Sequence, residues 1–158
     1  MPQPQENQPS TPSTTDREES YIQQRLEDQL TWYSSRSRYN QSRYNIHKTI
    51  EIISAALIPL LSGMGDRVPY GAWVIGGLGA TIAISSAISA LHKYHENWIT
   101  YRTTLEQLKQ EKYRYTTAVA PYDTAERFPL LVQRVEGIIT KEHAQWREAI
   151  TQPPKEDT

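Results

Sequence analysis

Residues 68–91 read VPYGAWVIGGLGATIAISSAISAL, a run of 24 residues without a charged side chain. About 20 largely apolar residues, each adding about 1.5 Å of helical rise, cross the roughly 30 Å hydrocarbon core of a bilayer. Glycine, alanine and serine are frequent in this run; glycine weakens a helix in water, but small residues let helices pack closely in a membrane. We therefore predict a transmembrane helix over residues 71–91.

A second apolar run, residues 50–65, precedes it and reads IEIISAALIPLLSGMG. Its uncharged part, residues 52–65, is short enough to be a buried helix of a soluble protein. A transmembrane partner joined by a short polar turn makes a membrane hairpin the simpler solution, and membrane helices tolerate a proline such as Pro59. The sequence predicts a transmembrane helix over residues 49–65 and an external turn over residues 66–70, with turn residues Gly63, Gly65, Asp66 and Pro69.

The flanks of the hairpin are polar, which is why the mean hydropathy of the chain is −0.67. Thr15 and Glu18 fit a capping box that begins a cytosolic helix over residues 15–48. Its apolar stripe consists of Ile22, Leu26, Leu30 and Tyr33. A second cytosolic helix, over residues 92–118, repeats large side chains four and three residues apart. This coiled-coil-like seam predicts packing on the first helix, and its members are Tyr94, Trp98, Tyr101, Leu105, Leu108, Lys112 and Tyr115.

A last helix is predicted over residues 124–150, after Pro121 and a cap at Asp123 or Thr124. Its apolar face holds Phe128, Leu131, Val135, Ile138 and Trp146. Residues 1–14 and 151–158 lack the apolar surface that offsets ordering entropy, so we expect disordered tails. The predicted fold class is all-α: a single helical membrane domain over residues 15–150, in which a two-transmembrane helical hairpin carries long cytosolic helical extensions.

Charge predicts the orientation of the hairpin. Four cations precede it and two follow it, whereas the turn holds one aspartate and one arginine; the flanking cations are Arg36, Arg38, Arg43, Lys48, Lys93 and Arg102. Loops rich in lysine and arginine stay in the cytoplasm. We therefore predict a multi-pass protein of the cell inner membrane with both termini cytoplasmic and the lipid bilayer as its surroundings.

Several classes of function find no support in the sequence. A net charge of −1 gives no general basis for binding nucleic acid, and the absence of cysteine excludes disulfides and thiolate metal sites. No catalytic triad, carboxylate pair or phosphate loop can be assembled, so we predict no enzyme, no catalytic residue and no cofactor beyond a permeant cation. His92, His95 and Glu96 have the spacing of a metal clasp, but interfacial histidines are the preferred interpretation and no metal site is predicted.

Five residues are candidates for an ion pathway: Asp66, Glu51, Thr81, Ser85 and Ser89. A ring of hairpins would place Asp66 at the outer mouth, where carboxylates attract cations, although a solvated turn aspartate is the simpler explanation. Glu51 is the acid inside an apolar run, which marks a functional candidate, unless an ion pair with Lys48 explains it. The three hydroxyls repeat every four residues and form a stripe that could line water or bond back to the helix backbone.

Small residues form another stripe on the second transmembrane helix: Gly76, Gly79, Ala80, Ala83 and Ala87. Small side chains let a neighbouring helix approach closely in a membrane. Two such stripes on one helix require two neighbours, which favours a homo-oligomer.

An ordered set of residues after the hairpin carries a family resemblance: Trp98, Tyr101, Arg102, Glu106, Glu111, Tyr122, Arg134, Glu136, Glu142 and Trp146, preceded by the pair Trp32 and Tyr33. Over about residues 21–150 the chain resembles a bacterial two-transmembrane domain of unknown function related to the SLATT superfamily. The resemblance implies a helical membrane protein that faces the cytosol, and SLATT-like domains are thought to be pore-forming effectors set beside nucleotide-signalling proteins in bacterial defence.

Three functions remain open from the sequence. The first is a homo-oligomeric, cation-permeable channel or pore at the hairpins. The second is a gated pore-forming effector of a nucleotide-dependent defence system, which the resemblance implies. The third is a non-conducting membrane adaptor whose cytosolic helices bind an unidentified cytosolic regulator.

Overall fold

The computed structural model describes residues 13–65 and 69–151, and in these residues every element is a helix, as predicted. The helices are α1 (Thr14–Ser20), the π-helical segment η1 (Tyr21–Leu26), α2 (Glu27–Gly63), α3 (Gly71–Leu91), α4 (Tyr94–Thr116) and α5 (Arg127–Thr151). The expected tails and the predicted turn residue Asp66 lie in residues 1–12, 66–68 and 152–158, outside the described part.

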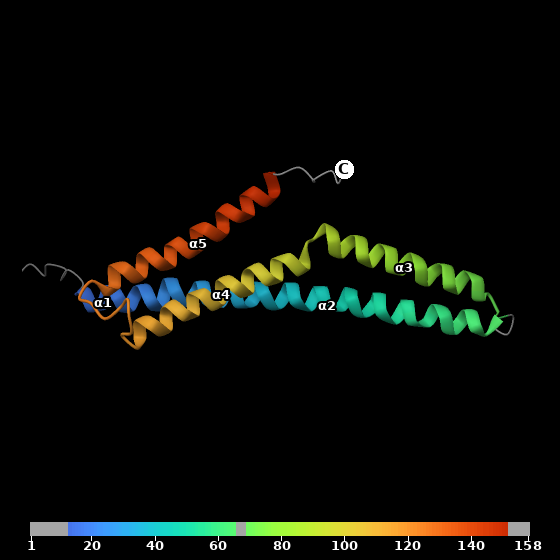
Figure 1. Cartoon of the computed structure of the whole chain (residues 1–158), viewed down its shortest axis with the longest axis horizontal. Helices are drawn as coiled ribbons and strands as arrows, with labels where there is room; N and C mark the ends of the chain where they lie inside the picture. Colours follow the sequence, from blue (N-terminus) through green and yellow to red (C-terminus); the bar gives the residue numbers. More distant parts are fainter. Residues whose placement is uncertain (1–12, 66–68, 152–158) are drawn as a thin grey trace, which may run out of the picture.

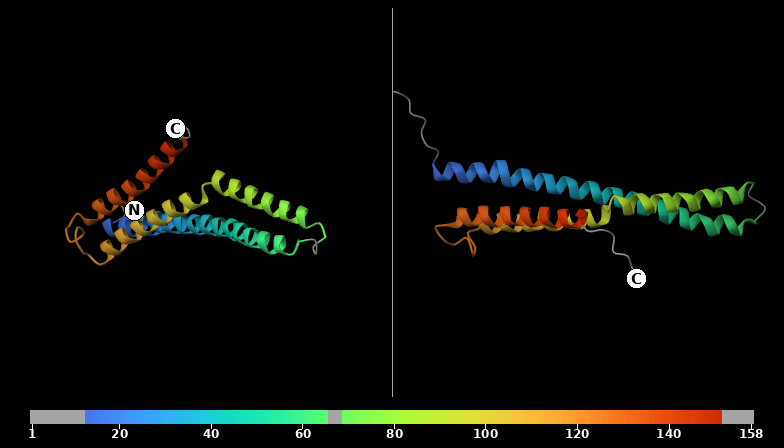
Figure 2. Two further views of the ribbon diagram at one scale, coloured as in Figure 1. Left: turned by 45° about the vertical axis from the view of Figure 1, so that its right-hand side comes forward. Right: turned by 90° about the horizontal axis from the view of Figure 1, so that it is seen from above.

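The segments α1, η1 and α2 form one long rod, and α3 and α4 lie antiparallel along it (Figure 1). The segments α1, η1 and α2 follow one another without a break, and α2 continues through Pro59. The chain returns along α2 first as α3 and then as α4, and α5 turns back against α4 (Figures 1 and 2). We call residues 49–63 of α2 together with α3 the hairpin, and the remaining helical residues the bundle.

The N-cap of the first helix lies two residues earlier than the sequence pattern predicted. Ser13, and not Thr15, is the N-cap: its Oγ accepts a hydrogen bond from the Asp16 amide at 3.2 Å, and the Asp16 carboxylate accepts one from the Ser13 amide at 3.0 Å. The prediction of a Thr15–Glu18 capping box was wrong. Ser13 and Asp16 have the same three-residue spacing as Thr15 and Glu18, so spacing alone could not distinguish the two pairs. The Glu18 carboxylate instead accepts a hydrogen bond from the Tyr115 hydroxyl at 2.8 Å.

The buried core of the described residues lies in the bundle. The predicted stripe and seam meet there, because Leu26, Leu30 and Tyr33 are buried against Leu105 and Leu108 of α4. From the last helix and the loop before it, the core adds Tyr122, Leu131, Val135 and Ile139. The long helices therefore pair within one chain. The seam residue Lys112, although polar, forms an ion pair with Glu27 on α2.

The hairpin is apolar but contributes nothing to this core. Two helical runs, Thr15–Gly63 and Gly71–Thr116, each contain an apolar window of 18 residues. Only 6% of each window is buried within the chain. Large side chains such as Ile52, Leu60 and Ile84 are more than half exposed, at 66%, 66% and 61%. The polar half of the sequence thus folds around its own core, whereas the apolar half leaves its side chains uncovered.

The connections around α4 differ from the single helix predicted over residues 92–118. A break at Lys93, which adopts a left-handed conformation (φ 48°), separates α3 from α4. The side-chain amide Nδ2 of Asn97 donates a hydrogen bond to the His92 carbonyl at 3.1 Å and so caps the end of α3. α5 begins at Arg127, later than the predicted cap at Asp123 or Thr124.

Candidate membrane-spanning hairpin and its junction with the bundle

The hairpin is held together by one narrow contact between its two helices. Every third or fourth residue of α3 turns toward α2 and is at least partly buried, whereas the residues between them are exposed. These contact residues are Gly71, Ile75, Leu78, Ile82, Ser85 and Ser89 on α3, and His47, Glu51, Ser54, Ile58 and Leu61 on α2. The contact is apolar near the turn and polar near the bundle.

The predicted hydroxyl stripe does not stay on one face of α3. Ser85 is 6% exposed and lies inside the contact, where its Oγ is 3.0 Å from Nδ1 of His47 and donates to the His47 carbonyl at 3.3 Å. Because that hydroxyl already donates, the network assigns the donor hydrogen to Nδ1 of His47. Ser89 is partly buried beside it, but Thr81 is exposed and donates to the Gly77 carbonyl at 2.9 Å. Residues four positions apart in a helix differ in direction by about 40°. The three hydroxyls therefore point in successively different directions around α3 and do not share one face.

The small residues predicted for helix packing form an uncovered face. Gly76, Gly79, Ala80, Ala83 and Ala87 are all exposed and lie to one side of the α2 contact. A Cβ atom added at Gly76 or Gly79 would meet no atom within 4 Å. No contact within the described chain therefore requires small residues at these positions.

Glu51 lies in the polar part of the contact. Its side chain is 14% exposed, and one carboxylate oxygen accepts a hydrogen bond from Nζ of Lys48 at 2.8 Å. The other oxygen, Oε1, is buried and has no hydrogen-bond partner among the described residues. The predicted ion pair exists, but it satisfies only half of the carboxylate.

Aromatic and histidine rings gather where the hairpin meets the bundle. The ring of Tyr94 stacks on His47 and on His92, with centroids 5.8 and 5.1 Å apart. Tyr44 stacks on Trp98, with ring centroids 6.4 Å apart, and its ring lies tilted against His95 at 4.8 Å. His92 and His95 thus face different aromatic partners, and no group of three metal-binding side chains occurs within residues 13–65 and 69–151.

The polar residues of the family resemblance tie the helices of the bundle together. Glu111 on α4 accepts hydrogen bonds from the Tyr122 hydroxyl and, at 3.0 Å, from Arg134 on α5. Glu142 accepts from the Tyr33 hydroxyl at 3.1 Å. The remaining signature residues add the exposed pair Arg102–Glu106, the ring contact of Tyr101 with Trp32, and a bidentate bond from Arg25 to Glu136 at 3.0 Å. The side chain of Trp146 lies outside the described part.

The electrostatics of this network raise the pKa values of its phenols and lower the pKa of Glu136. Burial raises the pKa of Tyr33, Tyr122 and Tyr21, and the neighbouring glutamates Glu142, Glu111 and Glu136 raise these pKa values further. The hydrogen bond from Arg25 lowers the pKa of Glu136. Each tyrosine can therefore donate to a carboxylate over the physiological range.

These raised pKa values predict that alkali weakens the bundle. The folded state holds its phenolic protons more tightly than the unfolded state, whose tyrosines have a pKa of 10.0. The stabilisation is complete below that value and is lost as the pH rises through the folded pKa. We expect the melting temperature of the detergent-solubilised chain to fall from pH 9 to 11, and to fall less steeply in Tyr33→Phe. Tyr113→Phe, which changes a 70% exposed tyrosine, should keep the wild-type slope. Equal slopes in all three proteins would contradict the assignment.

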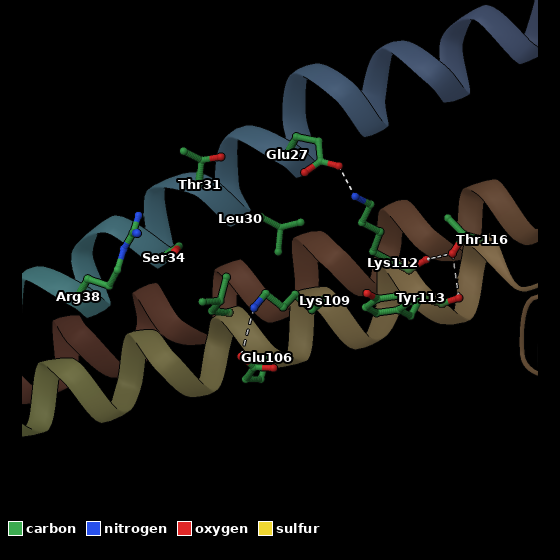
Figure 3. Close-up of a pocket in the computed structure, with 11 residues that line it drawn as sticks. Glu27, Leu30, Thr31, Ser34, Arg38, Glu106, Lys109, Lys112, Tyr113 and Thr116 are labelled. Atoms are coloured by element: carbon green, nitrogen blue, oxygen red, sulfur yellow. Dashed lines mark hydrogen bonds and ion pairs between the residues drawn. The ribbon is translucent and has the colours of Figure 1, made fainter. Parts of the chain in front are cut away.

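A groove with a volume of about 670 Å³ lies on the bundle between α2 and α4 (Figure 3). Leu30 and Leu105 contribute apolar surface to it, and cations and anions alternate along its walls. Lys112 is paired with Glu27 on the facing helix, and Lys109 with Glu106 at 3.3 Å on its own helix (Figure 3). The sequence analysis did not single out this groove, because it depends on how the two helices pair.

Sequence reasoning also missed the bond between His47 and Ser85 and the partners of Glu136. His47 was not among the predicted site residues. The sequence nevertheless contains a pattern that predicts this face of α2. Residues at intervals of three and four lie on one side of a helix, and this spacing connects His47, Glu51, Ser54, Ile58 and Leu61.

A family model with the description Protein of unknown function (DUF4231) matches residues 28–128. The match covers nearly all of α2, together with α3, α4 and the start of α5, and so contains the whole hairpin and its junction. No curated protein and no solved structure matches the chain. These comparisons contain no link to the SLATT superfamily.

Proposed function

The chain belongs to the family described as Protein of unknown function (DUF4231), and from the hairpin within the matched residues we propose that it is a homo-oligomeric membrane protein whose hairpins surround a cation pathway. The observation that carries the proposal is the contrast between the two halves of the molecule. The bundle buries a core of its own, whereas the hairpin leaves apolar side chains exposed over its length. An exposed apolar surface of this extent is costly in water and favourable in lipid.

Aromatic side chains at both ends of α3 support a membrane position. Tyr70 and Trp73, 80% and 82% exposed, lie at the turn, and Tyr44, Tyr94 and Trp98 lie at the junction. The 21 residues of α3 correspond to a length of roughly 30 Å, which matches the hydrocarbon core. Tryptophan and tyrosine are enriched at the two interfaces of a membrane. In this position the bundle lies in the cytoplasm beneath the inner membrane, with both termini on that side, because the flanking cations belong to the bundle and junction.

Self-association is the next step. Two helices cannot enclose a water-filled path, so a pore needs several hairpins. The exposed small-residue face of α3 offers the close approach that a second hairpin requires, and nothing within the described chain occupies it. In such a ring the cation pathway would use Asp66 at the outer mouth, and Thr81, exposed outside the α2 contact, is the hydroxyl best able to reach it. We do not include Glu51 in this pathway, because its side chain is only 14% exposed and lies in the contact between α2 and α3.

Ion flux across liposomes tests the proposal directly. We expect purified full-length protein to dissipate a potassium gradient, with a rate that rises more steeply than linearly at low protein density because assembly precedes conduction. Gluconate salts in place of chloride should leave the rate unchanged if cations carry the current. A flux no larger than that of empty liposomes, in samples where the protein floats with the vesicles, would reject conduction.

The groove between α2 and α4 favours a second candidate, a non-conducting adaptor that binds a cytosolic regulator. Its volume of about 670 Å³ falls within the range of ligand sites, and its walls are charged. The resemblance to SLATT-like domains adds a variant of the first proposal, in which the pore is a gated effector of bacterial defence. Growth arrest on overexpression that depends on an intact hairpin would favour the effector, and a stable monomer in detergent would favour the adaptor.

A further inference from the structure

A small cavity lies at the junction, next to the membrane boundary of the hairpin. Its volume is about 190 Å³, and residues from α2, α3 and α4 line it. Two ammonium groups, Lys48 and Lys93, and two carboxylates, Glu51 and Glu96, take part in the lining, together with Ser89 and His95. This mixture of charges at the end of an apolar helix pair needs an explanation that the packing of the chain does not provide.

The carboxylate of Glu51 is the informative group. Lys48 satisfies one of its oxygens at 2.8 Å, but Oε1 is buried without a hydrogen-bond donor in residues 13–65 and 69–151. A buried carboxylate oxygen left unpaired is destabilising, because it has lost its hydration without gaining a donor. Lys48 itself is 45% exposed and has donors to spare, because an ammonium group carries three hydrogens. No described group that lines the cavity donates to Oε1 of Glu51, and the two lysines are available to an anion.

We propose that this cavity binds the headgroup of phosphatidylethanolamine, a phospholipid that carries both an ammonium and a phosphate. The ammonium of the lipid donates to the Glu51 carboxylate, and its phosphate lies beside Lys48 and Lys93. The proposal rests on the membrane position of the hairpin, which brings the cavity to the level of the headgroups of the inner leaflet. The neighbouring rings of Tyr44 and His95 are typical of that level.

Other ligands of similar charge fit less well. A metal ion would meet two lysines and no cluster of three metal-binding side chains in the described residues. A purely anionic headgroup would pair with the lysines but would leave one oxygen of Glu51 without a donor. Phosphatidylcholine has the same charges as phosphatidylethanolamine, but its trimethylated nitrogen has no hydrogen to donate.

Native mass spectrometry of the full-length protein in detergent, with phosphatidylethanolamine, phosphatidylcholine or phosphatidylglycerol added singly, tests the proposal. We expect phosphatidylethanolamine to bind about tenfold more tightly than phosphatidylcholine, because hydrogen bonds to charged groups are among the stronger ones. Glu51→Gln should reduce that preference to within about twofold. Glu126→Gln removes the same charge from an exposed position at the far end of the bundle and should leave the preference intact.

Equal binding of the ethanolamine and choline lipids, or equal preference in Glu51→Gln and wild type, would overturn the headgroup site. Phosphatidylglycerol binding as tightly as phosphatidylethanolamine would overturn it as well, since the lysines alone would then explain the affinity. Flotation with liposomes tests the membrane position independently of the headgroup site. If the protein floats with liposomes but shows no lipid preference, the headgroup site is rejected and the membrane position is retained.

Discussion

Replacing Glu111 by leucine is expected to lower the unfolding free energy of the bundle by about 3 kcal/mol, within the range for breaking a buried charged pair. The Glu111 side chain is 11% exposed and joins three parts of the chain, because it accepts from Tyr122 in the α4–α5 loop and from Arg134 on α5. Tyr122 is itself 1% exposed. The leucine variant leaves a buried hydroxyl without an acceptor and a guanidinium without its partner.

Two companion variants separate hydrogen bonding from charge. Glu111→Gln keeps an acceptor for Tyr122 and removes only the charge, so we expect a loss of about 1 kcal/mol. In Glu111→Leu/Tyr122→Phe the orphaned hydroxyl is also removed, and stability should partly recover relative to Glu111→Leu. The measurement is amide hydrogen exchange of α4 and α5 in the detergent-solubilised full-length chain, which reports the bundle separately from the hairpin. A loss below 0.5 kcal/mol in Glu111→Leu, a value of about the size seen at ordinary surface sites, would mean that the network does not hold the bundle together.

The helices and the core of the bundle were accessible from the sequence because both follow from periodicity. The spacing of Leu26, Leu30 and Tyr33 matches that of Leu105 and Leu108, and both runs are buried against each other. Intervals of three and four residues place side chains on one face whatever the tertiary fold, so a pattern suffices.

The polar sites were less accessible because they depend on pairing across helices. Glu136 meets Arg25 across 111 residues of sequence, and Glu142 meets Tyr33 across 109. Nothing local distinguishes these glutamates from solvated ones. The hydroxyls of α3 show the same limit: a spacing of four suggested one stripe, but the contact with α2 takes Ser85 inward and leaves Thr81 outside.

The bundle and the hairpin have opposite requirements for a partner. The bundle satisfies its buried carboxylates and its core within one chain, so it needs no second copy to fold. The hairpin pairs along one narrow face and leaves a second face of small residues uncovered. We therefore propose that the chain assembles through the hairpin, with the bundle as a folded unit beneath it.

The most direct consequence concerns Ala83, which lies in the middle of the small-residue face. Ala83→Leu adds three carbon atoms where a second helix would have to approach, and overpacking of this kind costs about 1–3 kcal/mol. We expect association in detergent to weaken by at least tenfold and the liposome flux to fall in proportion. The fold of the single chain should not change, because Ala83 is exposed within it.

Ala56→Leu is the matched control. Ala56 lies on the outer face of α2, four residues from both Ile52 and Leu60, so a leucine there extends a surface that already carries large exposed side chains. We expect this variant to associate and conduct like the wild type. Light scattering of the detergent-solubilised proteins gives the oligomeric mass, and the flux assay at equal protein density gives the conduction. If Ala83→Leu kept the wild-type mass and flux, hairpins would not meet at this face, and any pore would need another interface.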